Sequence, residues 1–310
     1  MQIGLYLSNV PARPLERVLK RVRGAEEDGF RTLWFSQLYD YEALSLIALA
    51  GQATSRIELG TWVVPTYPRH PTALAQQALT AQAASGNRLA LAVGLSHKVV
   101  IEKRLGLDYG RPVRHMREYL EVLRPLLQGE EVEHQGQEFR VRLRVGVPGA
   151  EPPPLLLAAL GPQMLGLAGR LADGAAVWLG GPHYLGELAV PRLREAAERA
   201  GRPPPRVVAG LPVCVCDSEA AGRAAVAEMV TQSAALPSYR AVLEREGARN
   251  PEDVGLVGSE SKVREELERM AALGVTDFNA VVAGAGGEPE SARRTLDFLA
   301  GLSRDGGVAG

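Results

Sequence analysis

The end of one apolar segment combines a titratable side chain with small and polar neighbours. The strand expected over residues 88–93 runs directly into Gly94, Ser96 and His97. An imidazole has a reference pKa of about 6.5, so His97 can donate or accept a proton near neutral pH. A hydrogen-bonding role within a loop is the alternative. We therefore treat His97 as a candidate catalytic residue, and Gly94, Ser96 and His97 as candidate ligand contacts.

A second apolar run precedes this segment and ends in residues that could also meet a ligand. Residues 57–64 read as a buried strand, followed by a kinked loop over 65–71 and a helix over 72–85. A strand, a helix and another strand in this order predict a parallel βαβ unit. A ligand could then approach both strand ends, which adds Trp62, Val63 and Thr66 to the candidates.

The same alternation of apolar strands and amphipathic helices extends over the whole chain. It predicts eight strands, over residues 2–8, 32–36, 57–64, 88–93, 155–159, 174–179, 207–214 and 277–282. A TIM (β/α)8 barrel with insertion segments is the leading fold, and a doubly wound open sheet is the runner-up. We expect a single domain over 1–310, with a hairpin-like insertion near 130–154 and an irregular insertion near 236–257.

Active sites of such barrels lie at the carboxyl ends of the strands. The positions there include Ser8, Asn9, Ser36, Gln37, Ala159, Leu160, Gly161, Gly180 and Gly181, besides those already named. No strand end offers a lysine for a Schiff base except Lys98 just beyond one, and no His, Asp and Glu set gathers to bind a metal. Class I-type aldolases and metal hydrolases are therefore disfavoured, and we predict no metal site.

Two further classes of enzyme are disfavoured by the spacing of the glycines. The run that begins at Gly94 resembles the nucleophile elbow G-x-S-x-G but has Lys98 at its fifth position. Residues 284–289 lack the last glycine of G-x-G-x-x-G, and they lie too close to the end of the chain for a second βαβ half. A serine hydrolase and a nicotinamide-binding domain are both improbable.

The remaining glycines, amides and hydroxyls suit a large cofactor that brings its own reactive atom. Gly161 precedes Pro162, and Gly180-Gly181 precede Pro182, each at the expected start of a helix. Such starts can direct backbone N–H groups at a phosphate. Ordinary turn chemistry is the alternative for each glycine.

Composition limits the partners. The chain has 35 Lys and Arg against 36 Asp and Glu, a net charge of −1, which gives no electrostatic footprint for nucleic acid or an anionic membrane. No apolar run reaches the roughly 18 residues of a membrane span, and the N-terminus does not resemble a signal peptide. We expect a cytoplasmic enzyme with a small-molecule substrate, and Cys214 and Cys216 as core residues.

Several aromatic residues and histidines receive structural expectations. Trp34 and Trp178 lie within predicted strands and are assigned to the core, whereas the bend after Trp62 decides where that side chain points. His70 is expected to order a helix start. His115 is expected on a solvated helix face.

Taken together, several segments resemble the bacterial luciferase-like monooxygenase superfamily, most closely its deazaflavin-dependent oxidoreductases, which use coenzyme F420. The similarity lies in residues 59–71, 75–76, 86–88, 91–97, 111–120, 171–174 and 274–277. The resemblance implies a TIM barrel with F420, or alternatively FMN, across its mouth, and a homodimer. It also implies a cis peptide bond at Trp62–Val63, in a bulge of the third strand.

The chain departs from this family at the end of the second strand. Several deazaflavin enzymes carry an Asp-His or similar pair there, and this chain has Ser36 and Gln37. A neutral amide cannot act as a general acid or base at pH 7, so that role is absent, moved to His97 or Tyr39, or supplied by the substrate. Gln37 is kept beside His97 as a catalytic candidate, and Ser36 as a cofactor contact.

The function predicted by the resemblance is hydride transfer between F420 and a small organic substrate. An FMN-dependent luciferase-like monooxygenase and a non-catalytic deazaflavin-binding protein are the alternatives. The predicted cofactor contacts are Ser36, Trp62, Val63, Thr66, Gly94, Ser96, His97, Ala159, Leu160, Gly161, Gly180 and Gly181.

Overall fold

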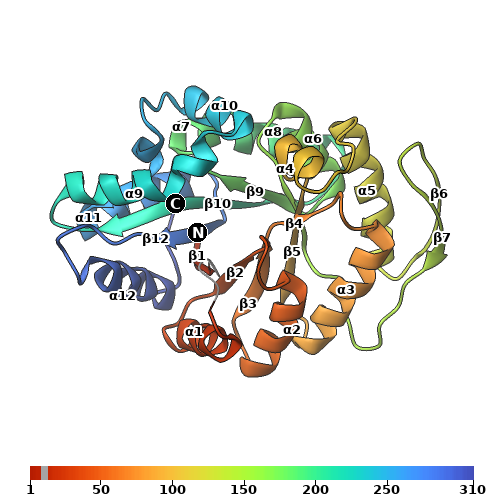
Figure 1. Ribbon diagram of the computed structural model, residues 1–310, viewed down its shortest axis with the longest axis horizontal. Coiled ribbons are helices and arrows are strands. Elements are labelled where there is room, and N and C mark those ends of the chain that lie inside the picture. Colours follow the sequence, from red (N-terminus) through yellow and green to blue (C-terminus); the bar gives the residue numbers. More distant parts are fainter. Residues whose placement is uncertain (8–12) are drawn as a thin grey trace.

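The computed structural model describes residues 1–7 and 13–310, and parallel strands form its centre (Figure 1). These strands are β1 Gln2–Leu7, β2 Thr32–Ser36, β3 Glu58–Trp62, β4 Val64–Pro65, β5 Leu89–Gly94, β8 Leu155–Ala158, β9 Gly174–Trp178, β10 Arg206–Val215 and β12 Asp277–Val282. The strand β1 pairs with both β2 and β12, and β10 pairs with both β9 and β12. The sheet therefore closes on itself, and the predicted TIM barrel is confirmed.

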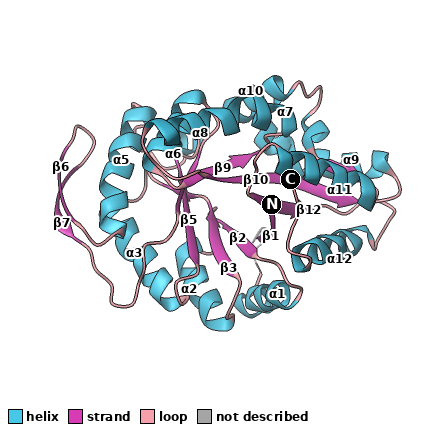
Figure 2. Cartoon of the chain, turned by 180° about the vertical axis from the view of Figure 1, so that it is seen from behind, coloured by secondary structure: helices cyan, strands magenta, loops and turns pink. Residues whose placement is uncertain are grey.

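Helices surround this ring of strands on its outside (Figure 2). The longer ones are α1 Leu15–Glu27, α2 Ala43–Ala53, α3 Pro71–Ala84, α5 Pro112–Leu127, α6 Pro162–Leu171, α8 Val190–Arg199, α9 Glu219–Ala234, α11 Glu260–Ala272 and α12 Ser291–Arg304. Shorter ones are α4 Lys98–Lys103, α7 Pro182–Tyr184 and the π-helical turn Leu185–Ala189. No helix in the described residues is long and apolar enough to cross a membrane.

The expected hairpin is present outside the barrel. Strands β6 Glu131–Gln135 and β7 Arg140–Arg144 pair antiparallel beside α5 (Figure 1). The carboxylate of Glu118, which is buried in α5, accepts hydrogen bonds from the backbone N–H groups of residues 137–139. These bonds tie the hairpin to the barrel, and they hold the pKa of Glu118 below its usual value although burial opposes this shift.

The segment 236–257, expected to be irregular, contains regular structure, so this expectation is corrected. It forms the helix α10 Pro237–Glu246, a 3-10 turn Pro251–Val254 and the short strand β11 Leu256–Gly258, which adds to β10. Pro237 occupies the first turn of α10, and Gly247 ends it in the left-handed region at φ 76°. Only Val242 and Leu243 of this helix are buried hydrophobic residues. Two such positions are too few to show the helical spacing of apolar residues, so the sequence does not predict this helix.

The barrel interior is filled by large side chains opposite glycines. Trp34 is fully buried there, against a cluster that includes Ala90, Ala92 and Leu156. A Cβ atom at Gly60 would collide with the Trp34 ring, and one at Gly210 would lie 2.6 Å from the ring of Trp62. Each indole therefore fills the space that is left free because the residue opposite it is a glycine.

An ion-paired cluster lies at the amino-terminal ends of the barrel strands, where β3, β10 and β12 begin. The Arg206 guanidinium contacts Glu58 at 2.5 Å and Asp277 at 2.6 Å, and it lies 5.6 Å from the centre of the Trp34 ring. Two nitrogens of the guanidinium reach both oxygens of Asp277, a bidentate arrangement. Strands β3, β10 and β12 are thereby joined beneath the indole.

The fit between Gly60 and Trp34 predicts a specific effect on stability. In Gly60→Ala the added methyl group must displace the indole, so the free energy of unfolding should fall by about 1–3 kcal/mol. Denaturant unfolding measures the change. Gly301→Ala is the matched control, because nothing lies within 4 Å of its added Cβ in α12, and it should be neutral or stabilising. Equal effects of the two substitutions would contradict this packing.

Candidate active site

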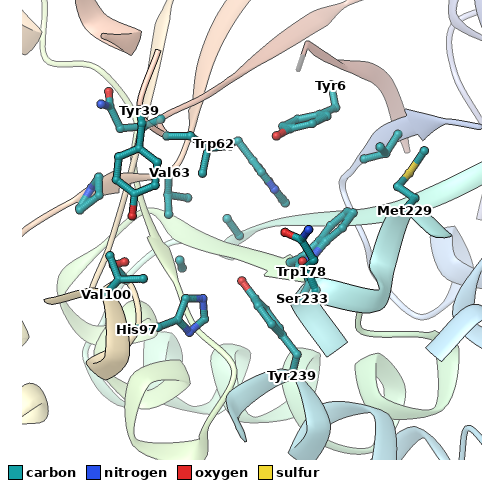
Figure 3. Close-up of a pocket in the computed structure, with 18 of the residues that line it drawn as sticks. Tyr6, Tyr39, Trp62, Val63, His97, Val100, Trp178, Met229, Ser233 and Tyr239 are labelled. Atoms are coloured by element: carbon teal, nitrogen blue, oxygen red, sulfur yellow. The ribbon is translucent and has the colours of Figure 1, made fainter. Parts of the chain in front are cut away.

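A cavity opens at the carboxyl ends of the barrel strands, where parallel barrels bind their ligands (Figure 3). Its walls include Trp62 and Val63 from the third strand region, Trp178 at the end of β9, and His97 just before α4. The helix α10 contributes Tyr239. Trp178 is half-buried and faces this cavity, so its assignment to the core is corrected.

The third barrel strand is interrupted by a bulge beneath the cavity. In β3, Gly60 pairs with Ala90, whereas in β4, Val64 pairs with Val93. Three residues, 61–63, thus lie opposite only two on β5, which is the definition of a bulge. The peptide bond between Trp62 and Val63 is cis, as predicted, and both side chains line the cavity.

The hydroxyl of Thr61 repairs the ladder at this bulge. It donates to the carbonyl oxygen of Ala92 and accepts from the N–H of the same residue, both at 2.8 Å. Thr61 and Ala92 are fully buried, so these backbone groups have no water to bond to. Sequence reasoning missed Thr61, because a threonine within a buried strand carries no signal of such a role.

His97 lies at the cavity with its ring partly covered by α10. Burial lowers the pKa of His97 from its ordinary value, so the ring is neutral at pH 7. Its Nδ1 lies 3.4 Å from the Ser238 hydroxyl, and the ring meets Tyr239 edge-on, with 5.2 Å between ring centres. A neutral imidazole beside a cavity is suited to accepting a proton.

Gln37 has one half of its amide already engaged. Its Oε1 accepts a hydrogen bond of 2.9 Å from the N–H of Ala43, at the start of α2. Gln37 lines the cavity, and its remaining polar atom, Nε2, can only donate. Ser36 is buried, and its Oγ has no hydrogen-bond partner within residues 1–7 and 13–310. Gln37 can therefore orient a ligand but cannot exchange a proton, whereas Ser36 is not among the described residues that line the cavity.

Thr66 and His115 form a support behind the cavity. The Thr66 hydroxyl lies 3.0 Å from Nε2 of His115, whose ring is stacked on Tyr67 with 4.0 Å between centres. His115 is buried, so its expected position on a solvated helix face was wrong. Its face of α5 packs onto the loop after β4. Thr66 thus holds this loop in place and is not among the described residues that line the cavity.

His70 begins α3 as expected, because its ring accepts a hydrogen bond from the N–H of Thr72. Cys214 and Cys216 are buried, also as expected. Ser96 lines the cavity, and a Cβ at Gly94 would lie 3.0 Å from Ala158 and Val63.

The two glycine-containing helix starts differ in what they offer to an anion. Near Gly180 and Gly181 the N–H groups of His183 and Tyr184 donate to the carboxylate of Glu246, at 3.1 and 2.6 Å. A protein carboxylate therefore already binds at this helix start. Gly161, which begins α6, has no side-chain cap, and a Cβ there would meet nothing within 4 Å.

Two other predicted contacts stand beside Gly161. Ala159 is buried, and the carbonyl oxygen of Leu160 accepts a hydrogen bond from the hydroxyl of Tyr184. Ser8 and Asn9, expected at the end of β1, lie outside the described residues. The main contributors that sequence reasoning missed are Ser238 and Tyr239, because both belong to the segment read as irregular.

The protein is a (β/α)8 barrel with an aromatic-lined cavity over a bulged third strand. This combination of fold and cavity is typical of enzymes that bind a ligand at the barrel mouth. A family model described as luciferase-like monooxygenase matches residues 1–302. The chain therefore belongs to the luciferase-like monooxygenase family, as the sequence resemblance predicted.

Individual relatives support the same placement. A Mycobacterium tuberculosis protein named as a coenzyme F420-dependent oxidoreductase is 32% identical over 193 residues, covering 58% of this chain and 55% of its own length. A 5,10-methylenetetrahydromethanopterin reductase of Methanolobus tindarius is 28% identical over 243 residues, covering 77% of this chain and 73% of its own. This chain thus spans about half the length of the first relative.

Comparison of structures shows the shared fold. The F420-dependent tetrahydromethanopterin reductase of Methanopyrus kandleri superimposes with a TM-score of 0.80 at 23% identity. The match covers 96% of this chain and 97% of the reductase. The barrel and its surrounding helices are therefore common to both proteins.

The role of Thr61 predicts a loss that depends on its hydroxyl. Thr61→Val keeps the shape but leaves the N–H and carbonyl of Ala92 buried and unpaired, at about 1–3 kcal/mol for each group. The free energy of unfolding, measured with denaturant, should fall accordingly. Thr61→Ser keeps the hydroxyl and should lose only about 1 kcal/mol for the missing methyl group. A valine variant as stable as the serine variant would contradict the role of this hydroxyl.

Proposed function

We propose that this protein is an oxidoreductase that binds coenzyme F420 at the barrel mouth and transfers a hydride between it and a small organic substrate. The observation that carries the proposal is the floor formed by Trp62 and Val63 on a bulged third strand. Relatives named as F420-dependent enzymes support the choice of cofactor. The proposal extends what those names say of the relatives to this chain.

The residues around this floor fit a flat tricyclic ring. The floor itself is apolar, and Ala158 and Ala176 beside it are small, which leaves width for the ring. Polar groups at the edges, the Gln37 amide and the Ser96 hydroxyl, can hydrogen-bond to ring heteroatoms. The deazaflavin ring therefore fits this part of the cavity in shape, and the Gln37 and Ser96 side chains offer it hydrogen-bond donors.

For the phosphate-bearing tail we favour the start of α6 over the start of α7. Backbone N–H groups at a helix start attract anions, and Gly161 leaves open space beside them. At Gly181 the carboxylate of Glu246 already accepts these bonds and would repel a phosphate. The predicted contact at Gly161 is therefore kept, those at Gly180 and Gly181 are not, and Ala159 and Leu160 contribute only by positioning Gly161.

Deazaflavin chemistry supplies the hydride when the cofactor is bound, and the protein contributes position and proton control. His97 is neutral at pH 7, so it can accept a proton released from an alcohol or relay one to solvent. Gln37 donates a hydrogen bond and keeps its protonation state. Aromatic and aliphatic side chains make up much of the cavity wall, beside these polar groups.

Two alternatives share the same cavity. An FMN-dependent monooxygenase would use the same floor with a flavin ring, and a structural neighbour, a 3,6-diketocamphane monooxygenase of Pseudomonas putida, is described in complex with FMN. A deazaflavin-binding protein without catalysis would need no proton acceptor, whereas the imidazole of His97 lines the cavity. A homodimer and a cytoplasmic location remain expectations from the sequence.

Titration with both cofactors tests the proposal. We expect the protein to quench or shift F420 fluorescence at micromolar concentrations, and to bind FMN distinctly less well. Tighter binding of FMN would overturn the cofactor assignment. Gly161→Asp should weaken F420 binding because it adds like charge beside the tail. Gly161→Ala is the control and should bind normally, since the methyl group meets nothing nearby.

His97 should affect rate more than affinity. A general acid or base contributes about 10²–10⁴ in rate, so His97→Ala should lower turnover by such a factor. Its dissociation constant for F420 should stay within a few-fold of the wild type. A variant that binds F420 poorly but turns over normally at saturation would make His97 a binding residue instead. Steady-state kinetics and fluorescence titration together decide between these outcomes.

A further inference from the structure

The helix α10 brings a phenol group to the cavity from a segment outside the regular βα repeat. Tyr239 lines the cavity, and Figure 3 shows its hydroxyl pointing toward the middle of the cavity while its ring lies beside His97. The contact is edge-on, with 5.2 Å between ring centres and 64° between ring planes. The tyrosine is therefore held beside the candidate proton acceptor.

Contacts at both ends of α10 fix the position of this tyrosine. At the start of the helix, Ser238 lies 3.4 Å from Nδ1 of His97. At its last residue, Glu246 accepts the two N–H bonds of the α7 start. A helix of ten residues that is anchored at each end presents Tyr239 in a defined place.

The hydroxyl of Tyr239 is available to a ligand. It makes no hydrogen bond to any other residue of the described ranges 1–7 and 13–310. Burial, with a smaller effect from Tyr6 nearby, raises the pKa of Tyr239 to about 12. The group is therefore protonated at pH 7, and a protonated phenol can donate a hydrogen bond.

We propose that Tyr239 is a catalytic residue that donates a hydrogen bond to an oxygen on the reacting carbon of the substrate. The inference rests on the proposed function and deepens it, because it names the substrate class as a neutral carbonyl compound or the corresponding alcohol. The cavity walls also include Leu236, Val100 and Met229, which suit an apolar remainder. A hydrogen bond to the carbonyl oxygen makes the attached carbon a better hydride acceptor.

Two arginines that line the cavity contact other residues of the protein. Arg69 pairs with Glu42 at 3.0 Å, and Arg104 donates to the Tyr39 hydroxyl at 3.2 Å. A neutral oxygen acceptor requires only the Tyr239 hydroxyl.

Two small probes of matching shape test this assignment. Cyclohexanone carries the oxygen, and methylenecyclohexane replaces it with a CH₂ group. With the protein saturated with F420, the fluorescence of the bound cofactor reports the affinity for each probe. Tyr239→Phe should weaken cyclohexanone binding about three- to tenfold, the effect of one net hydrogen bond, and leave methylenecyclohexane unchanged.

Tyr41→Phe is the matched control. It removes a hydroxyl that donates to the carbonyl of Arg13, away from the described lining of the cavity, and should bind both probes as the wild type does. Circular dichroism melting checks that each variant is folded. If Tyr239→Phe is unfolded, Ser238→Gly in its place tests the same contact, and a loosened Tyr239 should again weaken only cyclohexanone.

The outcomes separate this inference from the proposed function. Failure of F420 to bind would refute the proposed function, and the probes would then be titrated against the tryptophan fluorescence of the protein alone. Equal cyclohexanone affinity in wild type and Tyr239→Phe, or no binding of cyclohexanone to the wild type, would overturn the role of Tyr239. Weaker binding of both probes to Tyr239→Phe would also overturn it, because the substitution would then affect the fit of the ring and not a hydrogen bond to the oxygen.

Discussion

The site depends on how one side chain completes the barrel ladder. A bulge between β3 and β4 interrupts the pairing of the third strand with β5 and would leave Ala92 without partners on that side, and the Thr61 hydroxyl replaces both missing bonds. The residues that follow, Trp62 and Val63, then form the cavity floor. Because unpaired buried backbone groups are costly, this hydroxyl stabilises the bulge and the floor that it carries.

The barrel interior supports the floor from below. Gly210 gives room to the ring of Trp62, and Trp62 in turn meets Trp34 edge-on, with 5.5 Å between ring centres. Trp34 rests near the guanidinium of Arg206, which is held by two carboxylates. A continuous column of packed groups therefore runs from the ion-paired end of the barrel to the ligand cavity, and the α10 segment closes the cavity from the side.

Sequence reasoning predicted the barrel because its apolar runs alternate regularly with helices, and it predicted the cis bond at Trp62–Val63 only through family resemblance. It missed the roles of Thr61 and Tyr239. Thr61 bonds a residue 31 positions away, and α10 has too few buried residues to show a period. Beside Gly180 and Gly181, where the sequence predicts a cofactor contact, the N–H of Tyr184 donates to Glu246, which lies 62 positions later in the chain. Contacts of this range are set by the fold and cannot be read from local pattern.

A crystal structure of the protein with F420 tests the central claim most directly. The account predicts that the deazaflavin ring lies against Trp62 and Val63, with its other face open toward His97 and Tyr239. It also predicts the tail at the start of α6, with Glu246 still bonded to the start of α7. A ring bound elsewhere, or a tail phosphate that displaces Glu246, would contradict the account.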